Sequence, residues 1–422
     1  MKSILHSITR ILTLFYILAF INQAWATDGY FSHGYGTKQK SMGGVSTALT
    51  FNAFSAITNP ANAVYIQNNW GLGIAFFNPN RQYAVSGSPS GFPNTFPLTP
   101  GTVKSKSTGF FIPSLSYNRL INEKSAFNFA IFGNGGMNTD YKTNTFNTTK
   151  PTGVNLSQLF VNTSYAYKVT DNHAFGVTAI FGYQWFEAKG LTAFSGFSRY
   201  NTKLTDNKSD KAYGYGARLG YSGQITPQLR IGASYQTRIW MTEFNDYKGL
   251  FAEKGDFDVP ATWNAGLAWD INSAWTLAAD LTQIYYSSVK SVGNPMKPAD
   301  FQNDILLGDK KGAGFGWNDM TVYKIGCEYR HGNDWSARVG YNYGKQPIPT
   351  SEVMFNILAP GVIEHHLTFG ASKKIGSKYE FSLAVMRGFS NEVKGANPME
   401  APGQQAIALK MNQWEFEIGL GF

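Results

Sequence analysis

The chain has 422 residues, of which 15% are charged and 15% aromatic, with 44 glycines and a formal net charge of +9. A soluble globular domain usually carries about a quarter charged residues, so the composition argues against an ordinary soluble protein. The basic residues are scattered rather than clustered in a stripe, which argues against nucleic-acid binding and favours contact with anionic lipid headgroups or attraction of an anionic substrate.

Residues 1–26 have the layout of a secretory signal peptide. Lys2 and Arg10 flank the start of an apolar run from Ile11 to Ile21, and Ala24-Trp25-Ala26 is a small-x-small cleavage site. The run is short for a membrane-spanning helix of about 20 residues, and no longer apolar run follows it. A mature chain embedded in a membrane must therefore form a closed barrel, because every backbone donor and acceptor in hydrocarbon needs a partner.

Residues 27–69 are rich in small residues and do not alternate between apolar and polar positions. A short helix is expected over Ser46 to Phe54. A segment of this size before the first strand is either a periplasmic tail or a plug. Side chains alone do not fill a barrel of about fourteen strands, so we expect a plug, or hatch.

Residues 70–422 read as strands of a transmembrane antiparallel β-barrel. In the final segment Trp414, Phe416 and Ile418 point one way and Glu415 and Glu417 the other, which suits lipid outside and a polar lumen. We expect an all-β fold of about fourteen strands, an even number as in bacterial barrels. The expected starts are Trp70, Val103, Lys124, Asn155, His173, Lys211, Gln228, Pro260, Ala274, Asp319, Asp334, Val362, Ser377 and Lys410.

The connections alternate between short turns such as Thr170-Asp171-Asn172 and long stretches. The long ones include Pro79 to Thr102, Lys189 to Asp210, and Val289 to Asn318. Outer-membrane barrels have short periplasmic turns and long extracellular loops, so both chain ends are expected on the periplasmic side of the outer membrane.

No enzyme signature is found in the sequence. It contains no Gly-x-Ser-x-Gly elbow, and His365 and His366 are neighbours in a strand, so they point to opposite faces and cannot form one catalytic or metal site. Gly312 to Gly316 lacks the helix that a nucleotide-binding loop needs. We expect no enzymatic activity, no cofactor and no metal.

The chain resembles the FadL/TodX family of outer-membrane transporters of long-chain fatty acids and other hydrophobic compounds, over nearly all of its mature length. Asn59-Pro60-Ala61 matches the Asn-Pro-Ala motif of the family's hatch domain, and Pro347-Ile348-Pro349 is also specific. Phe132 to Met137 lies where family members have an inward kink in the third strand. Phe422 resembles the terminal aromatic residue that outer-membrane barrels present to the barrel-assembly machinery.

The resemblance implies uptake of a fatty acid or hydrocarbon, bound on the way in a lumen pocket above the hatch, by a protein in contact with outer-membrane lipid and lipopolysaccharide. We expect a monomer that does not bind nucleic acid. The kink at Gly133, Asn134, Gly135 and Gly136 is expected to open the wall for lateral exit; from the residues alone, a plain turn is the alternative. A general diffusion porin, or a structural or adhesive barrel such as a phage receptor, is the alternative function.

Two further sets of residues are candidates for substrate contact. Apolar residues of the third and fourth long loops are expected to capture substrate, with mutual packing of the loops as the alternative: Leu191, Phe194, Phe197, Phe244, Leu250 and Phe251. Cations are candidates for binding a carboxylate head, with ion pairing to acids such as Asp280 or Glu328 as the alternative: Arg199, Lys203, Arg230, Arg238 and Arg338.

Overall fold

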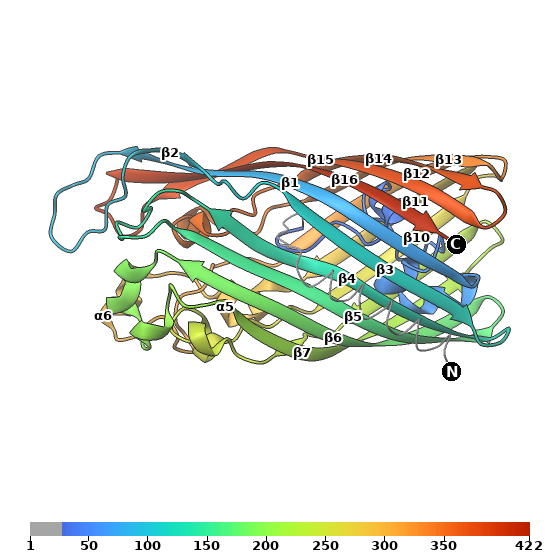
Figure 1. The fold of residues 1–422 in the computed structure, drawn as a ribbon, viewed down its shortest axis with the longest axis horizontal. Coiled ribbons are helices and arrows are strands. Elements are labelled where there is room, and N and C mark those ends of the chain that lie inside the picture. The colour runs from blue at the N-terminus through green and yellow to red at the C-terminus, as the bar shows by residue number, and fades with distance from the viewer. Residues whose placement is uncertain (1–27) are drawn as a thin grey trace, which may run out of the picture.

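The computed structural model describes residues 28–422, and the expected signal peptide, residues 1–26, lies outside that range. Fourteen long strands of the described chain close into an antiparallel barrel (Figure 1). Each long strand pairs with the next along the chain, and the first pairs with the last. They are β1 (Asn69–Gly87), β3 (Phe110–Leu120), β4 (Ser125–Asp140), β5 (Gly153–Thr170), β6 (His173–Lys189), β7 (Asp210–Gln224), β8 (Leu229–Gln236), β10 (Thr262–Asp270), β11 (Trp275–Ile284), β12 (Met320–His331), β13 (Trp335–Gly344), β14 (His365–Ile375), β15 (Tyr379–Ala396) and β16 (Gln405–Gly421).

The predicted alternation along the strands is observed. In β16 the side chains of Trp414, Phe416 and Ile418 are exposed on the outer face, whereas Glu415 and Glu417 are buried in the lumen. An apolar outer face suits surrounding lipid, and a polar inner face suits a lumen that contains polar chain.

Two short strands extend the wall at the end that carries the long loops. β2 (Gly101–Lys104) pairs with β1, and β9 (Trp240–Met241) pairs with β7. The predicted start of the second barrel strand at Val103 is wrong, because Val103 belongs to β2 and the wall strand β3 begins only at Phe110. The predicted loop start at Pro79 is also wrong, because β1 continues to Gly87 in register with β16.

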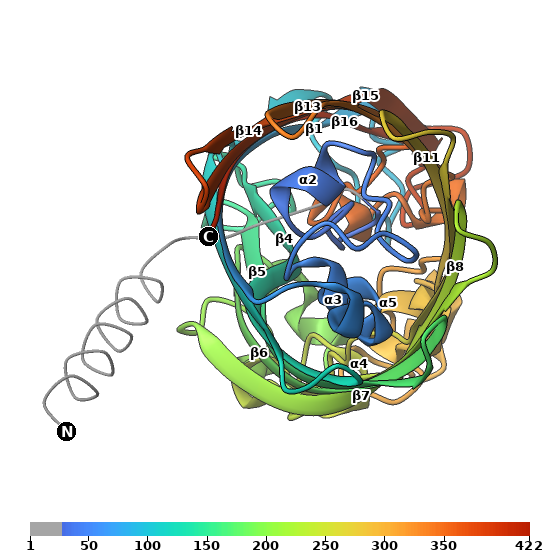
Figure 2. The same ribbon diagram turned by 90° about the vertical axis from the view of Figure 1, so that its right-hand side faces the viewer.

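Residues 28–68 lie inside the barrel, within the ring of strands seen in Figure 2, and we call them the hatch segment. It contains three short helices, α2 (Thr37–Lys40), α3 (Ser55–Thr58) and η1 (Pro60–Tyr65). The helix expected over Ser46 to Phe54 does not form. The amides of Ser46 and Thr47 instead donate to the carboxylate of Asp280 on β11, at 2.8 and 2.9 Å, so a contact with the wall replaces helical hydrogen bonds.

The long connections fold over the opposite end of the barrel from the hatch segment and the C-terminus (Figure 1). They contain η2 (Thr192–Phe197), η3 (Asn201–Lys203), η4 (Asn245–Tyr247), α4 (Ala252–Gly255), η5 (Tyr286–Ser288), α5 (Lys290–Gly293), α6 (Pro298–Gln302), η6 (Thr350–Glu352) and η7 (Phe355–Ile357). No helix in the described part of the chain is long and apolar enough to cross a membrane.

Candidate functional site

Strand β4 leaves its neighbour β3 partway up the barrel wall. The β3–β4 ladder ends at Phe132, whereas β4 stays paired with β5 along its whole length. The β4–β5 register shifts between Gly133 and Gly135, which leaves Asn134 as an extra residue. Such a bulge bends a strand and disrupts its ladder locally. Among the described residues, the upper part of β4 therefore has no ladder with β3.

The hatch segment occupies the edge of β4 that β3 leaves. The Gly136 amide donates to the Tyr30 carbonyl at 3.0 Å, and the Ser32 amide donates to the Asn134 carbonyl at 3.0 Å. A Cβ atom on Gly135 would lie 2.9 Å from the carbonyl carbon of Tyr30 and closer still to its oxygen. Gly135 thus allows the hatch backbone to approach β4 this closely.

The side chain of Asn134 fixes the bulge from the lumen side. It accepts a hydrogen bond from the Tyr35 hydroxyl at 2.7 Å and donates to Gln158 of β5 at 3.0 Å. A cavity of about 280 Å³ lies between the hatch segment and the wall at this level, and Ser114 and Phe132 are among its lining residues. The hatch segment and the wall are therefore not fully packed against each other beside the bulge, on the inner side of the β3–β4 gap.

Aromatic rings connect the hatch segment to the long loops. Tyr30 is fully buried, and its ring centroid lies 5.1 Å from that of Tyr286, 5.9 Å from Trp317 and 6.1 Å from Phe257. Phe257 in turn lies 4.8 Å from Phe251 in the β8–β10 loop. A continuous apolar path thus runs from that loop to the residues that pair with the bulge.

An apolar cavity lies under the loops at the far end of this path, with about 480 Å³ of empty volume that includes space open to solvent. It is lined by residues of β5, β6 and four loops: Val154, Phe186, Leu191, Phe194, Leu250, Phe251, Ser291, Leu307, Ala313, Gly314, Phe315, Phe355 and Leu358. Apolar and aromatic walls are typical of sites for small hydrophobic ligands.

Four of the six loop residues suggested for substrate capture line this cavity, namely Leu191, Phe194, Leu250 and Phe251. The other two pack elsewhere: Phe197 against Phe301 at 4.8 Å, and Phe244 against Phe186 at 5.7 Å. Sequence reasoning missed Phe315 and Phe355, which come from the β11–β12 and β13–β14 loops, because no periodic pattern marks loop residues that converge only in the fold.

Residues 30–371 match the family model described as outer membrane protein transport protein (OMPP1/FadL/TodX). The chain belongs to the FadL/TodX family. Among curated relatives, the long-chain fatty acid transport protein of Escherichia coli O6:H1 is 21% identical over 322 residues, covering 64% of this chain and 71% of that protein. The protein is therefore an outer-membrane transport protein and not an enzyme.

Solved structures of other members share the fold of this FadL/TodX protein. The P. putida toluene transporter TodX superposes with a TM-score of 0.66 at 19% identity, covering 92% of this chain and 98% of that one. A Pseudomonas aeruginosa FadL homologue superposes with a TM-score of 0.70 at 16% identity, covering 93% of this chain and 99% of that one.

The Asn-Pro-Ala motif of this FadL/TodX protein anchors the hatch segment to the wall. The Asn59 amide donates to the carbonyls of Thr47 and Tyr221, both at 2.8 Å, and its oxygen accepts from the Ala61 amide at 3.1 Å. Pro60 begins η1, where the lack of an amide hydrogen costs nothing. The motif thus joins two parts of the hatch segment to β7.

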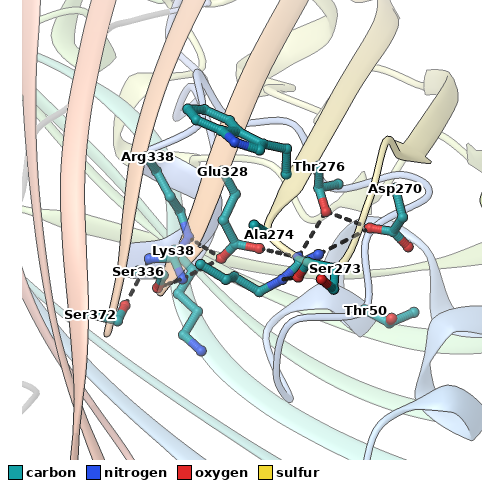
Figure 3. A network of polar contacts seen from close by, with 12 residues as sticks. Lys38, Thr50, Asp270, Ser273, Ala274, Thr276, Glu328, Ser336, Arg338 and Ser372 are labelled. Carbon is teal, nitrogen blue, oxygen red and sulfur yellow. Dashed lines mark hydrogen bonds and ion pairs between the residues drawn. The ribbon is translucent and has the colours of Figure 1, made fainter. Parts of the chain in front are cut away.

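A buried polar network stabilises the wall beside the hatch (Figure 3). Arg338 on β13 donates to Glu328 of β12 at 2.9 Å and to the hydroxyls of Ser336 and Ser372, each at 2.7 Å. Glu328 also pairs with Arg330 at 2.7 Å. Because its charges are paired and hydrogen-bonded, this network holds its side chains in fixed positions.

Ion pairs also tie the hatch segment directly to the last two strands. The ammonium of Lys40 lies 2.5 Å from the Glu415 carboxylate and 2.6 Å from that of Glu417, and all three side chains are buried. Lys38 pairs with Glu380 of β15 at 2.6 Å. Removing one partner from a buried pair leaves an uncompensated charge, so these contacts oppose displacement of the hatch as a whole.

The structure places each of the five candidate carboxylate-binding cations beside an acid. Arg199 pairs with Asp309 and Asp304, Lys203 with Asp246, Arg230 with Asp270, Arg238 with Asp258, and Arg338 with Glu328. Two buried arginines that sequence reasoning missed have no ion pair among the described residues, Arg81 and Arg218. Arg81 was overlooked because its position was assigned to a loop rather than to β1.

One acidic pair lies in the β8–β10 loop, close to the apolar path. Burial, followed by repulsion from Asp258 and a hydrogen bond between the two carboxyl groups, raises the pKa of Asp256 to about 8. The Ser291 hydroxyl, at the edge of the 480 Å³ cavity, donates to the backbone carbonyl of Asp256. The packing of the β8–β10 loop is therefore expected to depend on the protonation of Asp256.

The terminal residue Phe422 lies at the seam between the first and last strands. Its amide donates to the Trp70 carbonyl at 3.0 Å, and its carbonyl accepts from the Trp70 amide at 2.7 Å. The side chain is exposed on the outer face beside Trp70 and Tyr379. An accessible C-terminal ring is what the expected recognition by the assembly machinery requires.

Proposed function

We propose that this protein takes up hydrophobic compounds across the outer membrane, binding them in the 480 Å³ loop cavity and releasing them sideways between β3 and β4. The observation that carries the proposal is the bulge at Asn134, where β4 leaves β3 and the hatch segment takes over its edge. In this proposal residues 1–26 direct secretion, residues 27–69 form the hatch and residues 70–422 form the barrel.

A hydrophobic solute gains by staying out of water throughout its passage. Each methylene that leaves water contributes about 0.8 kcal/mol. An aqueous pore would keep the solute in water and would therefore provide none of this energy. The proposed route instead begins between the loop residues Phe194 and Phe251 and follows the buried rings of Phe257 and Tyr30 to the bulge. A lateral exit then delivers the solute into the hydrocarbon of the membrane.

The proposed moving part is the start of the hatch, residues 28–32, rather than the whole hatch segment. Its backbone contacts with β4 are two ordinary hydrogen bonds, each worth about 0.5–1.5 kcal/mol net. The rest of the hatch is anchored by the buried ion pairs of Lys40 and by Asn59. Displacing only the first residues leaves those anchors in place, although it also breaks the buried ion pair between Asp28 and Lys324, at 3.1 Å.

The test is to fill the space beside the gap. Ser114 lines the narrow cavity between the wall and the hatch segment, so a tryptophan there should close this space and obstruct the exit. We expect Ser114→Trp to retain binding of labelled toluene or dodecane by the purified protein while uptake by cells expressing it is lost, and we expect Ser114→Ala to retain both. Heat-modifiable mobility on gels checks that the barrel has folded. Normal uptake by a folded Ser114→Trp variant would refute lateral exit.

A further inference from the structure

The walls of the 480 Å³ loop cavity carry no charged side chain. Five of its lining residues are phenylalanines, at 186, 194, 251, 315 and 355. Ser291 contributes a hydroxyl, but that hydroxyl already donates to the backbone carbonyl of Asp256. The cavity thus offers a ligand apolar and aromatic surface and lacks the donors that a carboxylate requires.

The charged groups that contact the cavity's lining elements include acids. Glu352 is buried and accepts a hydrogen bond from the Met296 amide at 2.8 Å. It packs so closely against Gly316, the neighbour of the lining residue Phe315, that a Cβ atom there would overlap the Glu352 carboxyl group. On another side, the backbone carbonyl of Asp256 accepts the hydrogen bond from Ser291. A carboxylate entering the cavity would therefore find the Glu352 carboxyl group behind the wall and no cation in the wall.

No cation of the described residues lines the cavity. Among those close to the loops, Arg199 donates to Asp309 at 3.0 Å and Lys203 pairs with Asp246 at 2.6 Å. Arg218 donates to the Ile57 carbonyl of the hatch and lines a separate polar pocket next to Asn134, not the loop cavity. Arg81 is buried on the lumen face of β1, and its two terminal nitrogens have no hydrogen-bond partner among the described residues, but it does not line the cavity.

We propose that the transported compound is an uncharged hydrocarbon rather than the anion of a fatty acid. This inference rests on the proposed function, because it concerns the ligand of the same cavity. A fatty acid could insert its tail and leave its carboxylate in water at the cavity mouth, but to be transported the carboxylate must follow the tail. Moving an unpaired charge between apolar walls is strongly disfavoured.

The experiment compares solutes that differ only in the charged group. Cells expressing the full chain, and the same cells without it, are given labelled toluene or benzoate, and dodecane or dodecanoate, at pH 7. We expect uptake of both hydrocarbons to rise by about tenfold or more over the control cells, and that of both carboxylates to stay within about twofold. Carboxylate uptake equal to that of the matched hydrocarbon would overturn the proposal.

Two variants test the cause of the preference. Leu250→Lys places an ammonium in the cavity wall and should raise carboxylate binding to the purified protein by about tenfold or more. Gly196→Lys adds the same charge to the neighbouring loop, at a position with open space around it and outside the cavity lining, and should leave binding unchanged. Equal gains in both variants would show that cavity charge is irrelevant and overturn the proposal.

The Arg81→Met variant distinguishes transport of an uncharged compound from transport of an anion. If the transported compound is uncharged, cells that express Arg81→Met should take up toluene and dodecane as well as cells that express the wild type. Carboxylate uptake that is present in the wild type and lost in Arg81→Met would identify an anion route and overturn the inference. Failure of all four solutes to enter would refute the proposed function itself, whereas hydrocarbon uptake that persists in Ser114→Trp would refute only the lateral exit.

Discussion

Replacing Gly135 by alanine should release the first residues of the hatch from β4. A Cβ atom there would lie 2.9 Å from the carbonyl carbon of Tyr30 and 3.2 Å from the Cα atom of Phe31, and closer still to the Tyr30 oxygen. Because real Cβ atoms do not make such contacts, the hatch backbone has to move away. The move breaks the two hydrogen bonds that involve Gly136 and Ser32.

The expected size of the effect follows from those two bonds. Each contributes about 0.5–1.5 kcal/mol net, so losing both costs about 1–3 kcal/mol, or a change of about 5- to 150-fold in the population of the released state. Hydrogen–deuterium exchange of the peptide that covers residues 28–36 should be faster by that factor. Gly196→Ala is the control, because a Cβ atom at Gly196 meets no neighbouring atom. Unchanged exchange in a folded Gly135→Ala barrel would refute the assignment of residues 28–32 as the movable part.

Three further predictions concern the cavity, the acidic pair and the hatch anchor. Phe194→Ala should weaken binding of toluene or dodecane by about 10- to 150-fold in a direct binding assay, since a buried phenylalanine contributes about 1.5–3 kcal/mol, whereas Phe197→Ala, outside the cavity lining, should have little effect. Because the folded pKa of Asp256, about 8, lies above the unfolded value of about 3.9, the free energy of opening the β8–β10 loop should fall as pH rises between these values. Hydrogen exchange of that loop measures the slope, which Asp256→Asn should reduce. Lys40→Met should lower the free energy of unfolding in urea by about 3–5 kcal/mol by leaving two buried glutamates unpaired, whereas Lys142→Met, which removes an exposed pair, should cost at most about 1 kcal/mol.

The strands were predictable because each must satisfy a simple local rule. A wall residue faces either lipid or lumen, so the alternation around Trp414 and Glu415 is visible in the sequence and is confirmed in the fold. The rule failed where turn-forming residues occur within or beside a strand. Pro79 suggested the end of β1, but the strand continues past it to Gly87.

The site was less predictable because its parts converge only in three dimensions. Phe315 and Phe355 are forty residues apart in loops of irregular sequence, yet both line one cavity. Likewise, no local pattern indicates that the Asp280 carboxylate accepts the amides of Ser46 and Thr47, which replaces the expected helix. What the sequence did indicate was the glycine-rich stretch of β4, although a turn and a bulge could be told apart only through the resemblance to the FadL/TodX family.

The pairing of β1 with β16 also constrains how the molecule is assembled. The seam joins Trp70, near the start of the barrel, to Phe422 at the end of β16, so the ring cannot close before β16 pairs with β1. The hatch segment precedes β1 and its lysine at position 40 is bound to glutamates of β16. We therefore expect the hatch segment to enter the barrel before β1 and β16 pair. Strand β16 then completes the wall and also holds the hatch segment in place through Lys40.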